Sequence, residues 1–144
     1  MTTGSTLADK LRIRPGQRVA LVNAPPSYPD RLAPLPEGAE VMDDLDRAAS
    51  AVHLFVGDAA ELARLVGSAQ AAVAPGGLLW IAYRKGGVKA GTDLNRDILR
   101  DTMATAHGWD SVTLVALDDA WSAMRFRPSD RASAAIDGPS SGSR

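Results

Sequence analysis

Apolar positions along the chain gather in short continuous runs that predict buried β-strands. Three of these runs are apolar at nearly every position, which is typical of parallel strands covered on both faces. They read RVALVN at 18–23, AVHLFV at 51–56 and LLWIAY at 78–83. A shorter run, AEVM at 39–42, predicts an edge strand. Parallel strands need crossover connections, so the pattern indicates a mostly parallel sheet with helices between the strands.

Helical spacing of apolar residues fills the segments between these runs. Asp58 is placed to cap a helix, with Glu61 three residues later. Apolar residues then recur at helical spacing up to about Val73. Thr92 is placed to cap a further helix over about 93–106.

The end of the chain predicts a β-hairpin, because only two residues separate the apolar runs 111–117 and 120–127. The elements together predict an α/β fold: a small doubly wound, Rossmann-like sheet, mostly parallel and ending in an antiparallel hairpin. We expect a single domain over residues 5–127. The segment 128–144 is rich in Ser, Ala, Gly and Pro and predicts a disordered tail, since it cannot bury enough apolar surface to offset its ordering entropy.

Residues 24–38 contain five prolines, which exclude a long helix and allow only a turn around 28–32. Proline-rich segments are preformed for docking, so Tyr28 is a candidate exposed residue for recognition of a partner. Trp121 is a second candidate. Either it packs the hairpin against the last helix together with Trp109, or it is partly exposed at a sheet edge and marks a partner surface.

Composition and charge narrow the function classes. Sixteen Lys and Arg residues against 17 Asp and Glu give a formal net charge of -1, so a non-specific nucleic-acid binder or a membrane-surface protein is not expected. The absence of cysteine excludes disulfides and cysteine-ligated metals, and with only two histidines we predict no metal site. No apolar leader or membrane-length run is present, and we expect a cytoplasmic protein.

Several stretches resemble known families. The sequence APGG followed by LLWI is similar to one helix-to-strand step of class I S-adenosylmethionine (SAM)-dependent methyltransferases, and the terminal helix and hairpin, with Gly108-Trp109 between them, resemble the end of that fold. More closely, Thr6 to Arg127 resembles the bacterial DUF3052 family, which has no established activity. The matching stretches are LADKLRIRPGQRVALVNAP, LFVGDAAEL, APGGLLWIAYRK, TDLNRDILR and DDAWSAMRF. Both resemblances imply a methyltransferase-like fold.

The chain departs from the methyltransferase pattern after the first strand. In that family a glycine-rich loop approaches the cofactor there, and an acidic residue ending the second strand holds the ribose. Here the loop reads Asn23-Ala24-Pro25-Pro26, which lacks glycine and contains two residues without an N–H donor. Asp43 or Asp44 stands where the ribose-binding acid belongs. Because the glycine-rich loop is absent, we expect that SAM is not bound, and we predict no cofactor.

Open α/β sheets bind ligands beyond the carboxyl ends of their strands. We expect five polar residues at that edge to form one crevice for a small anionic ligand. They are Asn23, Asp58, Arg84, Lys85 and Lys89. Two structural alternatives stay open: Asp58 is explained by its role as a helix cap, and the basic loop 84–91 is an ordinary solvated loop. His53, inside an apolar strand, is interpreted as a hydrogen-bonded core residue.

The scaffold is kept while the cofactor loop is altered, and no catalytic groups converge in the sequence. We therefore predict a non-catalytic, methyltransferase-like binding or regulatory module, not an enzyme, that acts on a protein partner or a small anionic ligand. The alternative is a small enzyme or a nucleotide- or SAM-binding protein that uses the crevice at the carboxyl ends of the strands.

Overall fold

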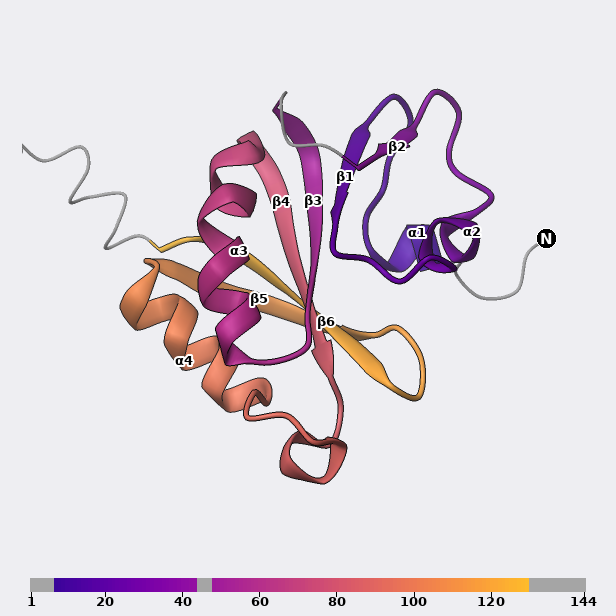
Figure 1. Cartoon of the computed structure of the whole chain (residues 1–144). Helices are drawn as coiled ribbons and strands as arrows, with labels where there is room; N and C mark the ends of the chain where they lie inside the picture. The colour runs from indigo at the N-terminus through magenta and orange to yellow at the C-terminus, as the bar shows by residue number, and fades with distance from the viewer. Residues whose placement is uncertain (1–6, 44–47, 130–144) are drawn as a thin grey trace, which may run out of the picture.

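The computed structural model of the chain describes residues 7–43 and 48–129, which form a six-stranded sheet of order β2-β1-β3-β4-β6-β5 (Figure 1). The first four strands are parallel to one another, and β6 is antiparallel to both β4 and β5. The predicted mostly parallel sheet with a terminal hairpin is confirmed. The strands are β1 (Arg18–Val22), β2 (Glu40–Met42), β3 (Ala49–Val56), β4 (Val73–Arg84), β5 (Trp109–Ala116) and β6 (Trp121–Pro128).

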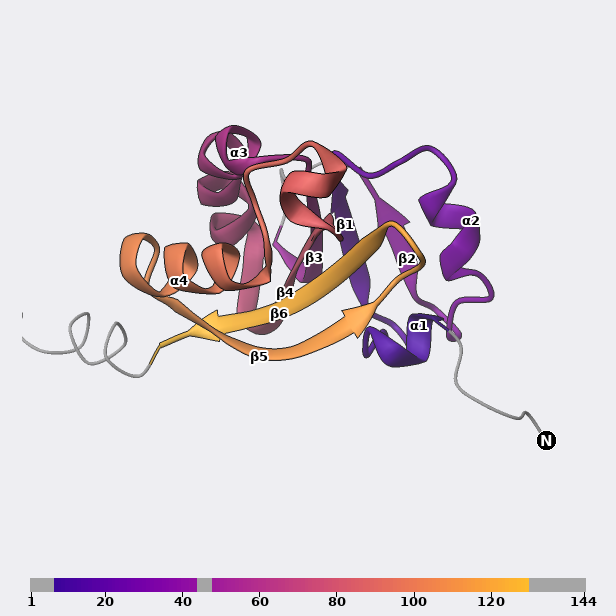
Figure 2. The same cartoon turned by 90° about the horizontal axis from the view of Figure 1, so that it is seen from below.

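Helices cover both faces of this sheet (Figure 2). The longer helices α3 (Ala59–Ala72) and α4 (Arg96–Ala106) pack on one face, and the short helices α1 (Leu7–Lys10) and α2 (Tyr28–Leu32) pack on the other. A 3-10 turn, η1 (Gly87–Ala90), follows β4. The arrangement is therefore doubly wound, as the apolar strands predict.

Two hydrophobic clusters, one on each face, hold the layers together. On the first face Val66 of α3 and Met103 of α4 are fully buried against the strands. On the second face Leu11 and Leu32 pack with Trp80, whose indole Nε1 donates to the carbonyl of Leu11 at 3.1 Å. Full burial of each such side chain contributes about 1.5–3 kcal/mol, which explains why the central strands are apolar on both sides.

The strand order reverses between β1 and β3. From β1 the chain moves outward to β2 and then returns past β1 to form β3 on its other side. Ligands of open α/β sheets bind at the carboxyl ends of strands at such a reversal, because the connecting loops diverge there and leave a crevice. The carboxyl ends of β3 and β4 both lie at the lower edge of the molecule in Figure 1.

The starts of the two long helices differ in how well the sequence predicts them. Asp58 caps α3 as predicted, since its Oδ1 accepts from the amide of Glu61 at 2.9 Å. The prediction for α4 is wrong by three residues, because the cap is Asn95, whose Oδ1 accepts from the amide of Ile98 at 2.8 Å. The Thr92 hydroxyl instead accepts from the amide of Leu94, which fixes a local turn before the helix.

The folded region reaches slightly further than the predicted boundary at residue 127. Strand β6 extends to Pro128, and Ser129 is buried, with its amide donating to the carbonyl of Gly108 at 2.9 Å. The predicted tail beyond that point and Asp44 lie outside the described residues. Within the part of the chain that the structure describes, no helix is long and apolar enough to cross a membrane.

Candidate functional site

A cavity of about 400 Å³ opens at the carboxyl ends of β1 and β2, beside the reversal of strand order. We call it the β1 pocket. Its walls are mostly apolar, and Asp43, directly after β2, is the only charged residue among those that line it. The lining residues are Leu21, Val22, Asn23, Ala24, Pro25, Pro26, Pro29 and Asp43.

The turn out of β1 is made by Asn23, whose φ of 61° lies in the left-handed region. Glycine adopts this conformation freely, and asparagine is one of the few other residues that tolerate it. The side chain also anchors the turn, because Nδ2 donates to the carbonyl of Phe55 at 2.9 Å and to Glu61 Oε1 at 3.2 Å. In the sequence, this turn is indicated by an asparagine directly after a buried strand, whereas a search for glycine does not find it.

Glu61 joins the ends of two strands to the start of α3. Its Oε1 accepts from Asn23 Nδ2 and also from the amide of Gly57, at 2.6 Å. The carboxylate therefore connects the end of β1, the end of β3 and the first turn of the helix. The sequence had indicated only a capping role for this residue.

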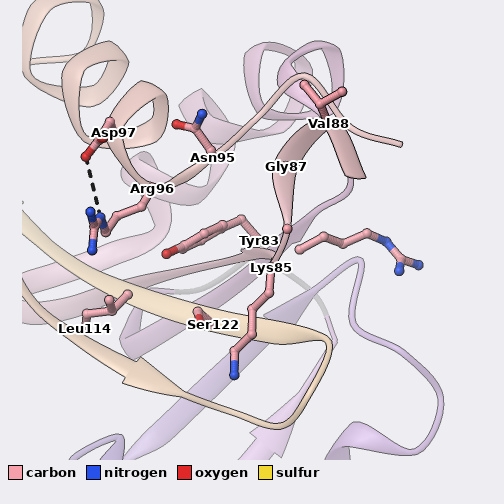
Figure 3. Close-up of a pocket in the computed structure, with 11 residues that line it drawn as sticks. Tyr83, Lys85, Gly87, Val88, Asn95, Arg96, Asp97, Leu114 and Ser122 are labelled. Atoms are coloured by element: carbon pink, nitrogen blue, oxygen red, sulfur yellow. Dashed lines mark ion pairs between the residues drawn. The ribbon is translucent and has the colours of Figure 1, made fainter. Parts of the chain in front are cut away.

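A second cavity, of about 490 Å³, lies at the same edge of the sheet beyond the end of β4 (Figure 3). We call it the β4 pocket. It is bounded by the end of β4, the η1 turn, the start of α4 and the β5–β6 hairpin, and it shares no lining residue with the β1 pocket. Its lining residues are Tyr83, Arg84, Lys85, Gly86, Gly87, Val88, Asn95, Arg96, Asp97, Leu114 and Ser122.

Tyr83 forms the inner part of the β4 pocket. Figure 3 shows its ring projecting between α4 and the hairpin, with Arg96 and Leu114 on either side of its hydroxyl end. Burial raises the pKa of the Tyr83 phenol, while a hydrogen bond with the Ser122 side chain and the charge of Arg96 act in the opposite direction. The phenol is therefore a neutral hydroxyl at neutral pH.

The charged groups around the β4 pocket are unequally paired. Asp97 Oδ1 contacts both Arg96 Nε, at 3.5 Å, and Arg100 Nη2, at 2.9 Å. Lys85 has no ion pair within residues 7–43 and 48–129. Arg84 is turned to the other face, where its guanidinium carbon lies 5.1 Å from the centroid of the Trp121 ring.

The five residues expected to form one crevice are separated. Asn23 lines the β1 pocket, whereas Arg84 and Lys85 line the β4 pocket. Asp58 and Lys89 line neither cavity, and Asp58 serves as the helix cap. Two cavities, instead of one crevice, lie at the edge of the sheet where the ligand site is expected.

The expectation that Tyr28 is exposed is wrong. Its side chain is 2% exposed, its hydroxyl is hydrogen-bonded to His53 Nδ1 at 2.9 Å, and its ring meets Phe55 edge to face. The prolines end α2 after a single turn and fold it onto the sheet, so that the segment buries its aromatic residue. The interpretation of His53 as a hydrogen-bonded core residue is confirmed, and burial lowers its pKa to about 3.

Trp121 is half-buried, and its ring meets Phe55 edge to face with centroids 5.2 Å apart. It belongs to the cluster on the α1–α2 face, whereas Trp109 packs against the cluster on the α3–α4 face. The expectation that the two tryptophans pack the hairpin against the last helix together is therefore wrong, because they lie on opposite sides of the sheet. Trp121 is partly exposed, as the other alternative expects, but β6 lies between β4 and β5 and is not an edge strand, and its role in binding a partner stays a prediction.

No family model and no curated protein matches the chain, so membership of DUF3052 stays a prediction. Solved structures do match. A complex of DhpI with S-adenosylhomocysteine (SAH) gives a TM-score of 0.57 at 17% identity, covering 85% of this chain and 82% of that one. The ribosomal protein L11 methylase of Lactobacillus delbrueckii subsp. bulgaricus gives 0.58 at 8% identity, covering 85% and 74%. A DhpI complex with SAM and HEP gives 0.54 at 17% identity, covering 83% of each chain. The chain has a Rossmann-like, methyltransferase-like fold.

These comparisons contradict two expectations, that the chain is not an enzyme and that SAM is not bound. Structures of the same fold hold SAM or SAH, and one is a methylase. At 8–17% identity the likeness itself establishes the fold alone. The physical reason for the wrong expectation is local: a loop without glycine can still make a left-handed turn, and Asn23 makes one at that position.

Proposed function

We propose that the chain is a SAM-dependent methyltransferase that holds SAM in the β1 pocket and its methyl acceptor in the β4 pocket. The observation that carries the proposal is the Asp43 carboxylate, which lines an otherwise uncharged cavity at the carboxyl ends of β1 and β2. The methyltransferase-like fold and the SAM and SAH complexes of DhpI support it.

The β1 pocket fits the nucleoside part of SAM. Its volume of about 400 Å³ is in the range of small-molecule sites, roughly 300–1,000 Å³. The carboxylate of Asp43 accepts hydrogen bonds and suits a ribose diol, and the rings of Pro25, Pro26 and Pro29 offer apolar surface for the adenine. Since Pro25 and Pro26 have no N–H, this loop holds the nucleoside by shape and apolar contact.

Bound SAM would supply the methyl group on its sulfonium sulfur: transfer would break the S–CH₃ bond, form a bond to a nucleophilic atom of the acceptor and leave SAH, and the acceptor would release its proton to solvent. The chain contributes binding and orientation. Because the two cavities share no lining residue, they would be able to hold two ligands at the same time, and fixing both reactants would convert an encounter in solution into a step within one complex.

Titration calorimetry of the full chain with SAM and with SAH tests the proposal. We expect both to bind, and we expect Asp43→Asn to weaken binding by about 10- to 100-fold, because a charge-assisted hydrogen bond is lost. Asp101→Asn is the matched control, since Asp101 is an exposed carboxylate on α4 and does not line the β1 pocket. An absence of SAM binding, or an equal loss in both variants, would overturn the proposal.

A further inference from the structure

We propose that the β4 pocket takes a small amphipathic molecule with an anionic group, a carboxylate or a phosphate, and that Lys85 is the residue that binds this group. That the molecule is the methyl acceptor rests on the proposed function. Binding of the molecule in the β4 pocket is independent of the proposed function, because only the residues around this pocket support it.

The size and position of the cavity indicate a separate small ligand. At about 490 Å³ the β4 pocket is of the size that binds small molecules. It shares no lining residue with the β1 pocket, so a ligand in one leaves the walls of the other in place. The hairpin and the η1 turn bound it on two sides.

Its charge indicates an anion. Three cationic residues and one acidic residue line the cavity, although the whole chain has a formal net charge of -1. The one carboxylate, on Asp97, is shared between Arg96 and Arg100, and Arg84 lies over Trp121. Neither Arg84 nor Lys85 has an ion pair among the described residues, and because Arg84 is held over the Trp121 ring, Lys85 is the lining cation that has neither an ion pair nor a ring contact there.

The main chain of Lys85 is fixed at the edge of the cavity. Its backbone amide donates to the carbonyl of Ala120 at 2.8 Å, which fixes the base of the side chain against the hairpin. The side chain itself is half-buried and extends across the hairpin on a different side from the Tyr83 hydroxyl (Figure 3). Its ammonium has three donors for the oxygens of a carboxylate or phosphate.

The rest of the lining suits an apolar body attached to the anionic group. Val88 is 86% exposed on the η1 turn and Leu114 is 44% exposed on β5, and both line the cavity. The Tyr83 phenol and the Ser122 side chain also line the cavity, as neutral groups. Apolar side chains at the edge of a charged cavity contribute affinity when a ligand covers them.

The test is binding of phenyl phosphate and of benzoate to the full chain, each compared with neutral benzamide, by calorimetry and by ¹⁵N chemical-shift changes. We expect both anions to bind, with shifts at the amides of Gly86 and Gly87, and benzamide to bind at least tenfold more weakly. The anion that binds more tightly shows whether the anionic group of the ligand is a phosphate or a carboxylate. Equal binding of benzamide, or shifts away from these glycines, would overturn the proposal.

Three variants make the test specific. Lys85→Gln is expected to weaken anion binding by about tenfold, the loss of one charge-assisted hydrogen bond. Arg14→Gln, which removes an exposed cation before β1 at the opposite edge of the sheet, is expected to change nothing, and an equal loss in both variants would overturn the proposal. Asp43→Asn separates the two proposals: it is expected to lower the affinity for SAM and leave that for phenyl phosphate unchanged.

Discussion

Asn23 combines a left-handed backbone with two side-chain hydrogen bonds, and the two contributions can be separated by substitution. Asn23→Gly keeps the favourable backbone conformation and loses the hydrogen bonds. Asn23→Ala loses the hydrogen bonds and also carries the strain of a left-handed alanine, about 1 kcal/mol. We expect the alanine variant to have the lower free energy of unfolding in urea denaturation. Equal stability of the two variants would show that the backbone conformation at this position is not constrained.

His53 makes the free energy of unfolding depend on pH. Burial lowers its pKa from 6.5 to about 3, so between these values the unfolded chain takes up a proton that the folded chain does not. The contribution of His53 to the free energy of unfolding has its full value above pH 6.5. It falls by about 1.4 kcal/mol for each pH unit below that value, down to about pH 3. We expect His53→Gln to be less stable at pH 7.5 and to lose this part of the slope in urea denaturation at pH 4–7.

His107→Gln provides the comparison, because His107 is half-buried at the end of α4 and lies outside both core clusters. This variant is expected to keep the acid slope of the natural chain. A slope that persists in His53→Gln and disappears in His107→Gln would contradict the assignment.

At the scale of elements, α2 depends on contacts with other parts of the chain. A helix of five residues is unstable by itself. Tyr28 attaches it to β3 through His53, and Arg31 attaches it to the hairpin, with Nη1 2.8 Å from Asp118 Oδ2 and Nη2 2.6 Å from the carbonyl of Leu117. Because Pro29 of α2 lines the β1 pocket, these contacts set the position of one of its walls.

Arg31→Gln is therefore expected to raise the Kd for SAM several-fold and to speed hydrogen exchange at the amides of α2, while α3 keeps its protection. Calorimetry and exchange mass spectrometry measure the two effects. Arg14→Gln is the matched control and is expected to change neither. Unchanged exchange in α2 would show that the contacts of Arg31 do not hold the helix.

The strands and α3 could be predicted because their signals are local: continuous apolar runs for the strands, and a capping aspartate with helical spacing for α3. The start of α4 could not be predicted, because Thr92 and Asn95 are both residue types that cap helices well. Which of them caps the helix depends on the burial of Leu94 and on the η1 turn before it. The burial of Tyr28 could not be predicted for a related reason. Its proline neighbours favour an extended segment locally, and burial against Phe55 and His53 overrides that preference.

At the scale of the whole molecule, the edge that carries the candidate site followed from the parallel sheet, and the division into two cavities did not. The β1 pocket depends on where α2 lies relative to β2, and the β4 pocket depends on the hairpin bringing Leu114 and Ser122 beside Tyr83. Both arrangements join segments that are distant in sequence. Spacing along the chain therefore identified several of the lining residues without showing which cavity each belongs to.

The contacts of Arg31 also bear on how the protein is made. They span 86 and 87 positions of the chain, from the first third to the last hairpin. During synthesis α2 leaves the ribosome well before its partners, and the sheet beneath it is completed only when β6 has paired with β4. A nascent chain that ends before the hairpin carries β1, the prolines, Asp43 and the Tyr28–His53 contact but lacks the contacts of Arg31, so the attachment of α2 to the hairpin, which helps to position a wall of the β1 pocket, is among the last to form.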